Sequence, residues 1–152
     1  MLYRRLLHFA LIAGACSRAY PPSSGVGAQR LLLQVYRYAL DSLENNRGDS
    51  VRACLATWGR HQGLADPPSE LLDSLQGGDT LLLTFKQCPM ANSLEVHDTV
   101  LIIVSLDSIA TSRRRVDLRT WRSGLWGAGY SCRVRHTRVG WQLRGCDLAW
   151  IS

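Results

Sequence analysis

The sequence predicts an α+β domain in which a long N-terminal helix and a short second helix precede an antiparallel meander sheet of four to five strands. Apolar side chains recur every three or four residues between residues 28 and 45, which is the spacing of a helix buried on one side. After residue 80 the apolar period changes to two, the period of a strand. Helices followed by strands, rather than alternating with them, are typical of the α+β class.

Residues 1–15 precede the domain and have the pattern of an export signal. Arg4 and Arg5 are followed by an apolar run over residues 6–12 and then by Ala13-Gly14-Ala15. This order of positive, apolar and small residues is typical of a signal peptide. A membrane-spanning helix needs about 20 apolar residues, so we expect cleavage rather than a permanent anchor helix.

Residues 12–16, Ile-Ala-Gly-Ala-Cys, resemble the end of a bacterial lipoprotein signal. The resemblance implies that Cys16 becomes the first mature residue and carries a lipid that attaches the protein to a membrane. Ala13 departs from the pattern, in which leucine is usual, and an ordinary secretory signal cut after Ala15 or Ala19 is the alternative. Ser17 resembles an outer-membrane sorting signal, so we expect an exported envelope protein anchored to the outer membrane.

Residues 16–27 combine proline, serine and glycine in the proportions of a flexible tether, which leaves residues 28–152 as one domain. The first helix is predicted over residues 28–45. A second helix is predicted to begin after Asp66, which would be its N-cap ahead of Pro67 and Pro68, and to end at Gly77-Gly78. Residues 50–57 fit a strand or a helical turn, and we favour a strand.

Strands are predicted over residues 80–85, 99–106, 114–121, 128–136 and 141–151. The second of these is apolar on both faces, which indicates a central strand. In the last one, Trp141 and Leu143 are out of phase with Cys146, Leu148 and Trp150. A bulge at Gly145 would bring these five side chains to one face, because glycine tolerates the bulge backbone.

A helix followed by a curved sheet resembles the cystatin-like or NTF2-like roll in the order of its elements. That resemblance implies a concave sheet face that binds a small molecule or houses an acid–base enzyme. The mature chain also resembles small exported bacterial proteins that end in a tryptophan-bearing strand, here residues 141–152. The second resemblance implies no particular activity.

Four cysteines remain if Cys16 is lipidated, and their even number in an exported chain indicates disulfides. Of the three possible pairings we favour Cys132–Cys146, because both lie in one predicted hairpin, and this leaves Cys54–Cys88. No Cys-x-x-Cys occurs, and no histidine stands at a ligand spacing from a cysteine. We therefore expect neither a metal site nor a cofactor.

The net charge of +6 is concentrated near the C-terminus, where Arg113, Arg114 and Arg115 form a run. Together with Arg133 and Arg135 they could bind anionic glycan or lipid head groups. The alternative is a solvated face, because Lys86 is the only lysine and arginine serves as the general surface cation. An exported protein meets little nucleic acid, so no nucleic-acid partner is expected.

No nucleophile, metalloprotease or phosphate-binding motif occurs in the chain, and no catalytic residue is predicted. His61, His97 and His136 fall in predicted loops or at strand ends. We therefore expect a module that binds an envelope protein or a small ligand rather than an enzyme. An NTF2-like enzyme is the alternative, and it would need a deep pocket containing a buried aspartate or histidine.

The best candidate binding segment is the glycine-rich stretch over residues 124–129, which places Leu125 and Trp126 near a hairpin tip. An exposed tryptophan is unfavourable in water unless a ligand or partner covers it. The alternative is that Trp126 folds back over the end of the sheet. The binding hypothesis thus predicts a solvent-exposed indole at position 126.

Overall fold

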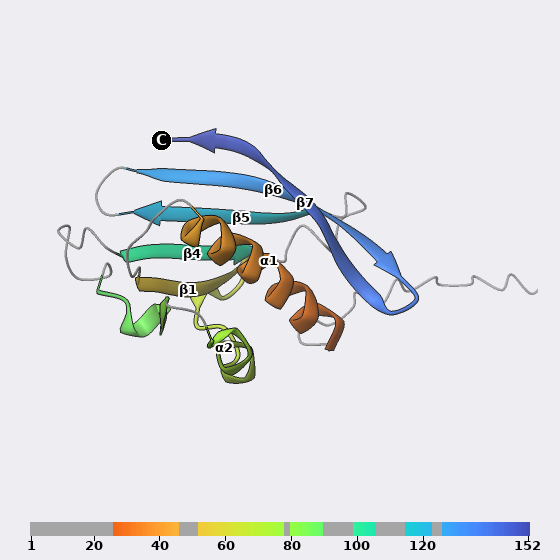
Figure 1. Ribbon diagram of the computed structural model, residues 1–152, viewed down its shortest axis with the longest axis horizontal. Coiled ribbons are helices and arrows are strands. Elements are labelled where there is room, and N and C mark those ends of the chain that lie inside the picture. Colours follow the sequence, from red (N-terminus) through yellow and green to blue (C-terminus); the bar gives the residue numbers. More distant parts are fainter. Residues whose placement is uncertain (1–25, 46–51, 78–79, 90–98, 106–114, 123–125) are drawn as a thin grey trace, which may run out of the picture.

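A computed structural model gives the fold and describes residues 26–45, 52–77, 80–89, 99–105, 115–122 and 126–152. The predicted signal peptide, Cys16 and nearly all of the tether lie outside these residues, as do His97, Arg113, Arg114 and Leu125. The described residues form an α+β domain with two α-helices and a mixed seven-stranded sheet (Figure 1).

The elements follow one another as α1 (Val26–Glu44), β1 (Arg52–Gly59), β2 (Gly63–Ala65), α2 (Ser69–Leu75), β3 (Leu81–Thr84), the 3-10 turn η1 (Phe85–Gln87), β4 (Thr99–Ser105), β5 (Arg115–Arg122), β6 (Gly127–Thr137) and β7 (Gly140–Ile151). The two predicted helices are present, and the segment that fitted either a strand or a helical turn is strand β1. Only the short β2 and the turn η1 have no counterpart among the predicted elements.

The sheet is larger than predicted, and it is not purely antiparallel. Strands β4, β5, β6 and β7 form the predicted antiparallel meander, but β1 pairs in parallel with both β3 and β4. The order β2-β1-β4-β5-β6-β7, with β3 also on β1, makes β1 an interior strand. Apolar alternation identifies a strand without fixing its partner, which is why the parallel pairing was missed.

The core lies between α1 and one face of the sheet, here called the inner face; the opposite face is the outer face. Figure 1 shows α1 crossing the strands. Its apolar stripe, which includes Leu31, Val35 and Leu40, is buried against alternate residues of β4 and β5 such as Ile102 and Leu118. Each such side chain contributes about 1.5–3 kcal/mol of apolar burial, so this contact is a major source of stabilisation for the domain.

Gln34 fixes α1 against the edge of the sheet. Its side-chain amide donates to the carbonyl of Trp141 at 3.2 Å, and its side-chain oxygen accepts from the N–H of Leu143 at 2.8 Å. β7 is an edge strand, and an unpaired edge exposes backbone groups that could pair with another chain. The helix thus satisfies part of this edge and holds β7 close to itself.

Tyr36 completes the hydrogen bonding of β1. On one side, β1 pairs with β3 through Leu55 and with β2 from Thr57 onward, so Ala56 falls between the two pairings. The Tyr36 hydroxyl donates to the Ala56 carbonyl at 2.6 Å. Burial of this phenol raises its pKa above the ordinary value. The tyrosine therefore stays neutral, as a hydrogen-bond donor within the core.

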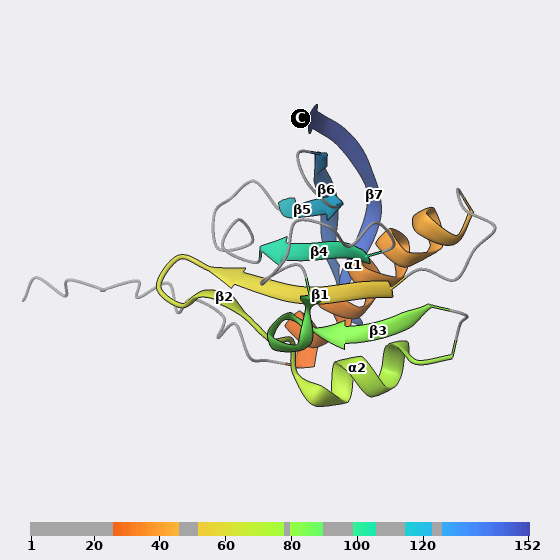
Figure 2. The same ribbon diagram turned by 90° about the vertical axis from the view of Figure 1, so that its left-hand side faces the viewer.

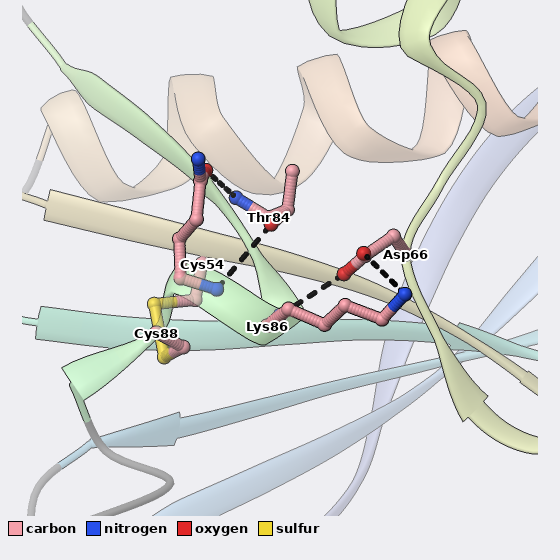
Figure 3. The surroundings of a disulfide bond; sticks show 6 residues. Cys54, Asp66, Thr84, Lys86 and Cys88 are labelled. Carbon is pink, nitrogen blue, oxygen red and sulfur yellow. Dashed lines mark hydrogen bonds and ion pairs between the residues drawn. A yellow bond between two sulfur atoms is a disulfide. The ribbon is translucent and has the colours of Figure 1, made fainter.

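Both predicted disulfides are present. Cys54 of β1 bonds to Cys88, which follows η1, with a Cα–Cα distance of 5.6 Å (Figure 3). Cys132 and Cys146 face each other across β6 and β7 with a Cα–Cα distance of 3.9 Å. Disulfides form and persist in oxidising compartments, so the two disulfides together indicate an exported protein.

Asp66 does not have its predicted role as the N-cap of the second helix. Helix α2 begins at Ser69, its N-cap position is Pro68, and no side chain caps it. Two consecutive prolines hold the chain extended and move the helix start beyond the reach of Asp66. Its carboxylate instead accepts from the backbone N–H of Lys86 at 3.0 Å and forms an ion pair with the ammonium at 3.6 Å (Figure 3).

The predicted bulge in β7 is present at Gly145. Arg133 pairs with Gly145 but Val134 pairs with Leu143, so Arg144 is the extra residue, and Gly145 has a positive φ of 149°. This shift brings Leu143 into phase with the side chain at position 146 on the inner face. The curvature of β7 is visible in Figure 2.

A second register shift near the end of β7 was not predicted. Tyr130 pairs with Leu148, whereas Gly129 pairs with Trp150, so Ala149 is an extra residue. Trp150 therefore lies on the outer face, and the prediction that it shares a face with Trp141 was wrong. The physical reason is that each inserted residue inverts the orientation of every side chain that follows.

We predict that Tyr36→Phe lowers the free energy of unfolding by about 1–3 kcal/mol, because the buried Ala56 carbonyl loses its donor. Urea denaturation of the oxidised protein would measure the change. Tyr38→Phe is the matched control, since the Tyr38 hydroxyl makes only a long, exposed contact of 3.5 Å to the Cys146 carbonyl. Equal losses in the two variants would contradict the role given to Tyr36.

Candidate functional site

A cavity of about 310 Å³ opens on the inner face, between the second half of α1 and strands β5, β6 and β7. It lies beyond the end of the continuous core, where Leu43 and Leu118 form part of its wall. The space exists because the facing side chains are small: Ala39 on the helix, Thr120 on β5 and Ala128 on β6. Larger residues at these places would close the gap between helix and sheet.

The wall of the cavity is supported from the outer face by two tryptophans. Trp121 of β5 and Trp150 of β7 lie with their ring centroids 5.5 Å apart. Their rings cover Gly127 and Gly129 of β6, which lies between them. A Cβ at Gly127 would lie 2.6 Å from Cε3 of Trp121, and one at Gly129 would lie closer still to Trp150. These glycines are therefore required by the indoles above them.

The rim of the cavity is apolar and exposed. Trp126 lines it with 67% of its surface accessible, Leu148 with 53% and Ile151 with 61%. The backbone holds the indole there, because the Arg122 N–H donates to the Trp126 carbonyl at 2.8 Å. Trp126 is thus not buried beneath the end of the sheet, and the alternative in which it folds back as a cover does not hold.

The predicted binding residues do not gather at one place. Trp126 is at the cavity, whereas Arg115 is exposed at the opposite end of β5 and lies on the outer face, paired in register with Arg133. Leu125, Arg113 and Arg114 lie outside the described residues. Arg122, Leu148 and Ile151 were not predicted as binding residues. Their place at the cavity depends on the position of α1, and that of Ile151 depends also on the second shift in β7.

The chemistry that the cavity offers is limited to hydroxyls and one cation. Among its described lining residues are Ser42, Thr120, two tyrosines and Arg122, and none carries a carboxylate or an imidazole. His61 and His136 are exposed elsewhere, and Asp147 forms an ion pair with Arg133 at 3.2 Å on the outer face. Within the described ranges, no three His, Cys, Asp or Glu side chains gather into a potential metal site.

The outer face has a smaller hollow of about 200 Å³, bordered by Trp58, Leu64 and Ile103 together with Asp117 and Arg119. Its two charged residues alternate along β5 and are of opposite sign. This hollow lacks an exposed aromatic side chain comparable to Trp126, since Trp58 is only 38% exposed. The inner-face cavity is therefore the stronger candidate.

Comparisons with protein-family models, with curated proteins and with solved structures gave no match. In the part of the chain that the structure describes, no helix has the length and apolar character needed to cross a bilayer.

We predict that Gly129→Ala lowers the free energy of unfolding by about 1–3 kcal/mol through overpacking against Trp150. Gly59→Ala in β1 is the matched control, because a Cβ there would meet only Gln62 at an ordinary 3.8 Å. Chemical denaturation would measure the free energy of unfolding of both variants.

The double variant Gly129→Ala with Trp150→Ala should lose less free energy of unfolding than the two single variants lose in sum. The smaller side chain at position 150 makes room for the new methyl group. Strict additivity would contradict the proposed contact.

Proposed function

We propose that this protein is an exported, lipid-anchored envelope protein whose domain binds an apolar ligand without transforming it. The single observation that carries the proposal is the exposed Trp126 at the mouth of the inner-face cavity. Ligand sites are commonly apolar hollows of roughly 300–1,000 Å³ that contain a few polar groups. The cavity lies at the small end of that range and has this composition.

The apolar rim supports binding more strongly than the cavity volume does. Trp126, Leu148, Ile151 and Tyr38 are large apolar or aromatic side chains that are exposed around one opening. A ligand that covers them would gain about 25 cal/mol of binding free energy for each Å² of apolar surface removed from water. Exposed apolar patches of this kind mark binding sites in soluble domains.

The enzyme alternative has less support from the geometry. An acid–base enzyme of the NTF2-like type needs a carboxylate or an imidazole within its pocket. The described lining of the cavity has neither, and its charged group is a guanidinium. The placement of α1 over a curved sheet is compatible with a cystatin-like or NTF2-like roll, and binding of a small molecule is the activity of such rolls that these residues favour.

The basic-module alternative also has less support. Arg115, Arg119, Arg133 and Arg135 share the outer face, but Asp117 lies between the first two and Asp147 pairs with Arg133. Alternating signs weaken the attraction for a polyanion. We therefore expect binding to the protein to depend on the inner-face cavity and not on the arginines of the outer face.

We predict that the neutral fluorophore N-phenyl-1-naphthylamine binds the cavity and gains fluorescence. The protein would be the exported chain with Cys16→Ser, so that no acyl chain competes. Ala128→Leu should fill the cavity and reduce the affinity at least tenfold, and Trp126→Ala should reduce it severalfold by removing part of the rim. Fluorescence titration measures both.

Leu64→Ala, at the outer hollow, is the matched control and should leave the affinity unchanged. Binding that survives Ala128→Leu in a folded protein, or that is lost in Leu64→Ala, would place the ligand elsewhere and contradict the proposal.

We predict that the protein isolated from its own membrane fraction begins at Cys16 and carries acyl chains. Intact mass spectrometry before and after reduction would measure the lipid and the two disulfides together. Cys16→Ser should release the protein from the membrane fraction. A mature chain that begins after Ala15 or Ala19 without a lipid would contradict the anchor but leave the export hypothesis intact.

A further inference from the structure

Arg122 is the only charged side chain among the described residues that line the inner-face cavity. It is the last residue of β5 and lies on the inner face, paired in register with the buried Val100. The side chain is partly buried, and no carboxylate of the described residues forms an ion pair with it. A guanidinium stays charged at any physiological pH.

The cation and the exposed indole lie at the same end of the cavity. The hydrogen bond from the Arg122 N–H to the Trp126 carbonyl places the two residues across the end of the β5–β6 hairpin. Thr120 is two residues from Arg122 on the same face, and its hydroxyl also lines the cavity. The remaining lining includes Leu43, Leu118 and Leu148 together with the hydroxyls of Ser42 and two tyrosines. The cavity thus combines one cationic side chain with a mainly apolar wall.

We propose that the cavity selects a single-chain amphiphile with a carboxylate head, such as a fatty acid, whose head group binds Arg122. This inference rests on the proposed function, because it names the class of apolar ligand. The planar guanidinium of an arginine has two parallel N–H donors that match the two oxygens of a carboxylate. The opposite charges strengthen the resulting hydrogen bonds. The small volume suits one alkyl chain and excludes the paired chains of a phospholipid.

The charges around Arg119 and Arg133 differ from those around Arg122. Both arginines lie on the outer face, where Arg119 borders a hollow that also contains Asp117 and Arg133 forms an ion pair with Asp147. A carboxylate drawn to general positive charge would find them partly neutralised. Arg122 combines a charge that no described carboxylate pairs with, partial burial and an adjoining apolar wall, and an amphiphile needs the three together.

The experiment measures displacement of N-phenyl-1-naphthylamine from the Cys16→Ser protein by dodecanoate and by dodecanol, both below their aggregation concentrations. We expect dodecanoate to displace the probe at a concentration at least about tenfold lower, as one charge-assisted pair would give. Arg122→Gln should remove this preference, expressed as the ratio of the two competitors' inhibition constants after each is corrected for that variant's own probe affinity. Arg119→Gln, on the outer face of the same strand, should keep the preference.

The outcomes separate the two proposals. If the probe binds and Ala128→Leu abolishes binding, but dodecanol competes as well as dodecanoate in the wild-type sequence, carboxylate selection is overturned and the apolar cavity stands. A preference for dodecanoate that persists in Arg122→Gln and disappears in Arg119→Gln would likewise overturn the assignment to Arg122. If neither the probe nor dodecanoate binds, by fluorescence or by calorimetry, both proposals fail.

Discussion

The register of β7 against β6 determines which side chains of β7 border the inner-face cavity and which lie on the outer face. Two extra residues, Arg144 and Ala149, shift the pairing, and each shift reverses the faces of all later side chains. The first shift brings Cys146 opposite Cys132, and the second turns Trp150 outward and Ile151 inward. Without the second shift, the rim of the cavity would gain an indole and lose an isoleucine, and Gly129 of β6 would have no ring above it.

The tryptophans near this hairpin consequently have different roles. The rings of Trp121 and Trp150 pack on Gly127 and Gly129 of β6, and this contact supports the sheet on its outer face. Trp126, in contrast, remains largely exposed beside the cavity. Three indoles close in sequence or in register thus divide into a structural pair and one side chain whose apolar surface is uncovered. That contrast is the strongest indication that Trp126 serves binding.

The sequence predicted those features that depend on local periodicity. The stripe around Tyr36, the alternation around Val116 and the phase break at Gly145 are all properties of consecutive residues, and the two disulfides followed from the hairpin and the cysteine count. Features that depend on which segments meet were missed: the parallel partners of β1, the hydrogen bond and ion pair from Lys86 to Asp66, and the cavity itself. In the sequence, Arg122 cannot be distinguished from the other surface arginines. Its position in the cavity follows only from the placement of α1 and β7 beside it.

The Cys132–Cys146 disulfide connects the proposed binding site with an oxidising compartment. The bond fixes the register in the middle of the β6–β7 hairpin, and the cavity rim at Leu148 and Ile151 lies only a few residues beyond it. A slip of one residue would exchange the inner and outer side chains of that segment, so oxidation protects the composition of the rim as well as the stability of the fold. Gln34 holds the same strand to α1 from its other edge, at Trp141 and Leu143. The cavity is therefore defined by a covalent bond on one side of β7 and a helix on the other, and the first of these constraints forms only in an oxidising compartment.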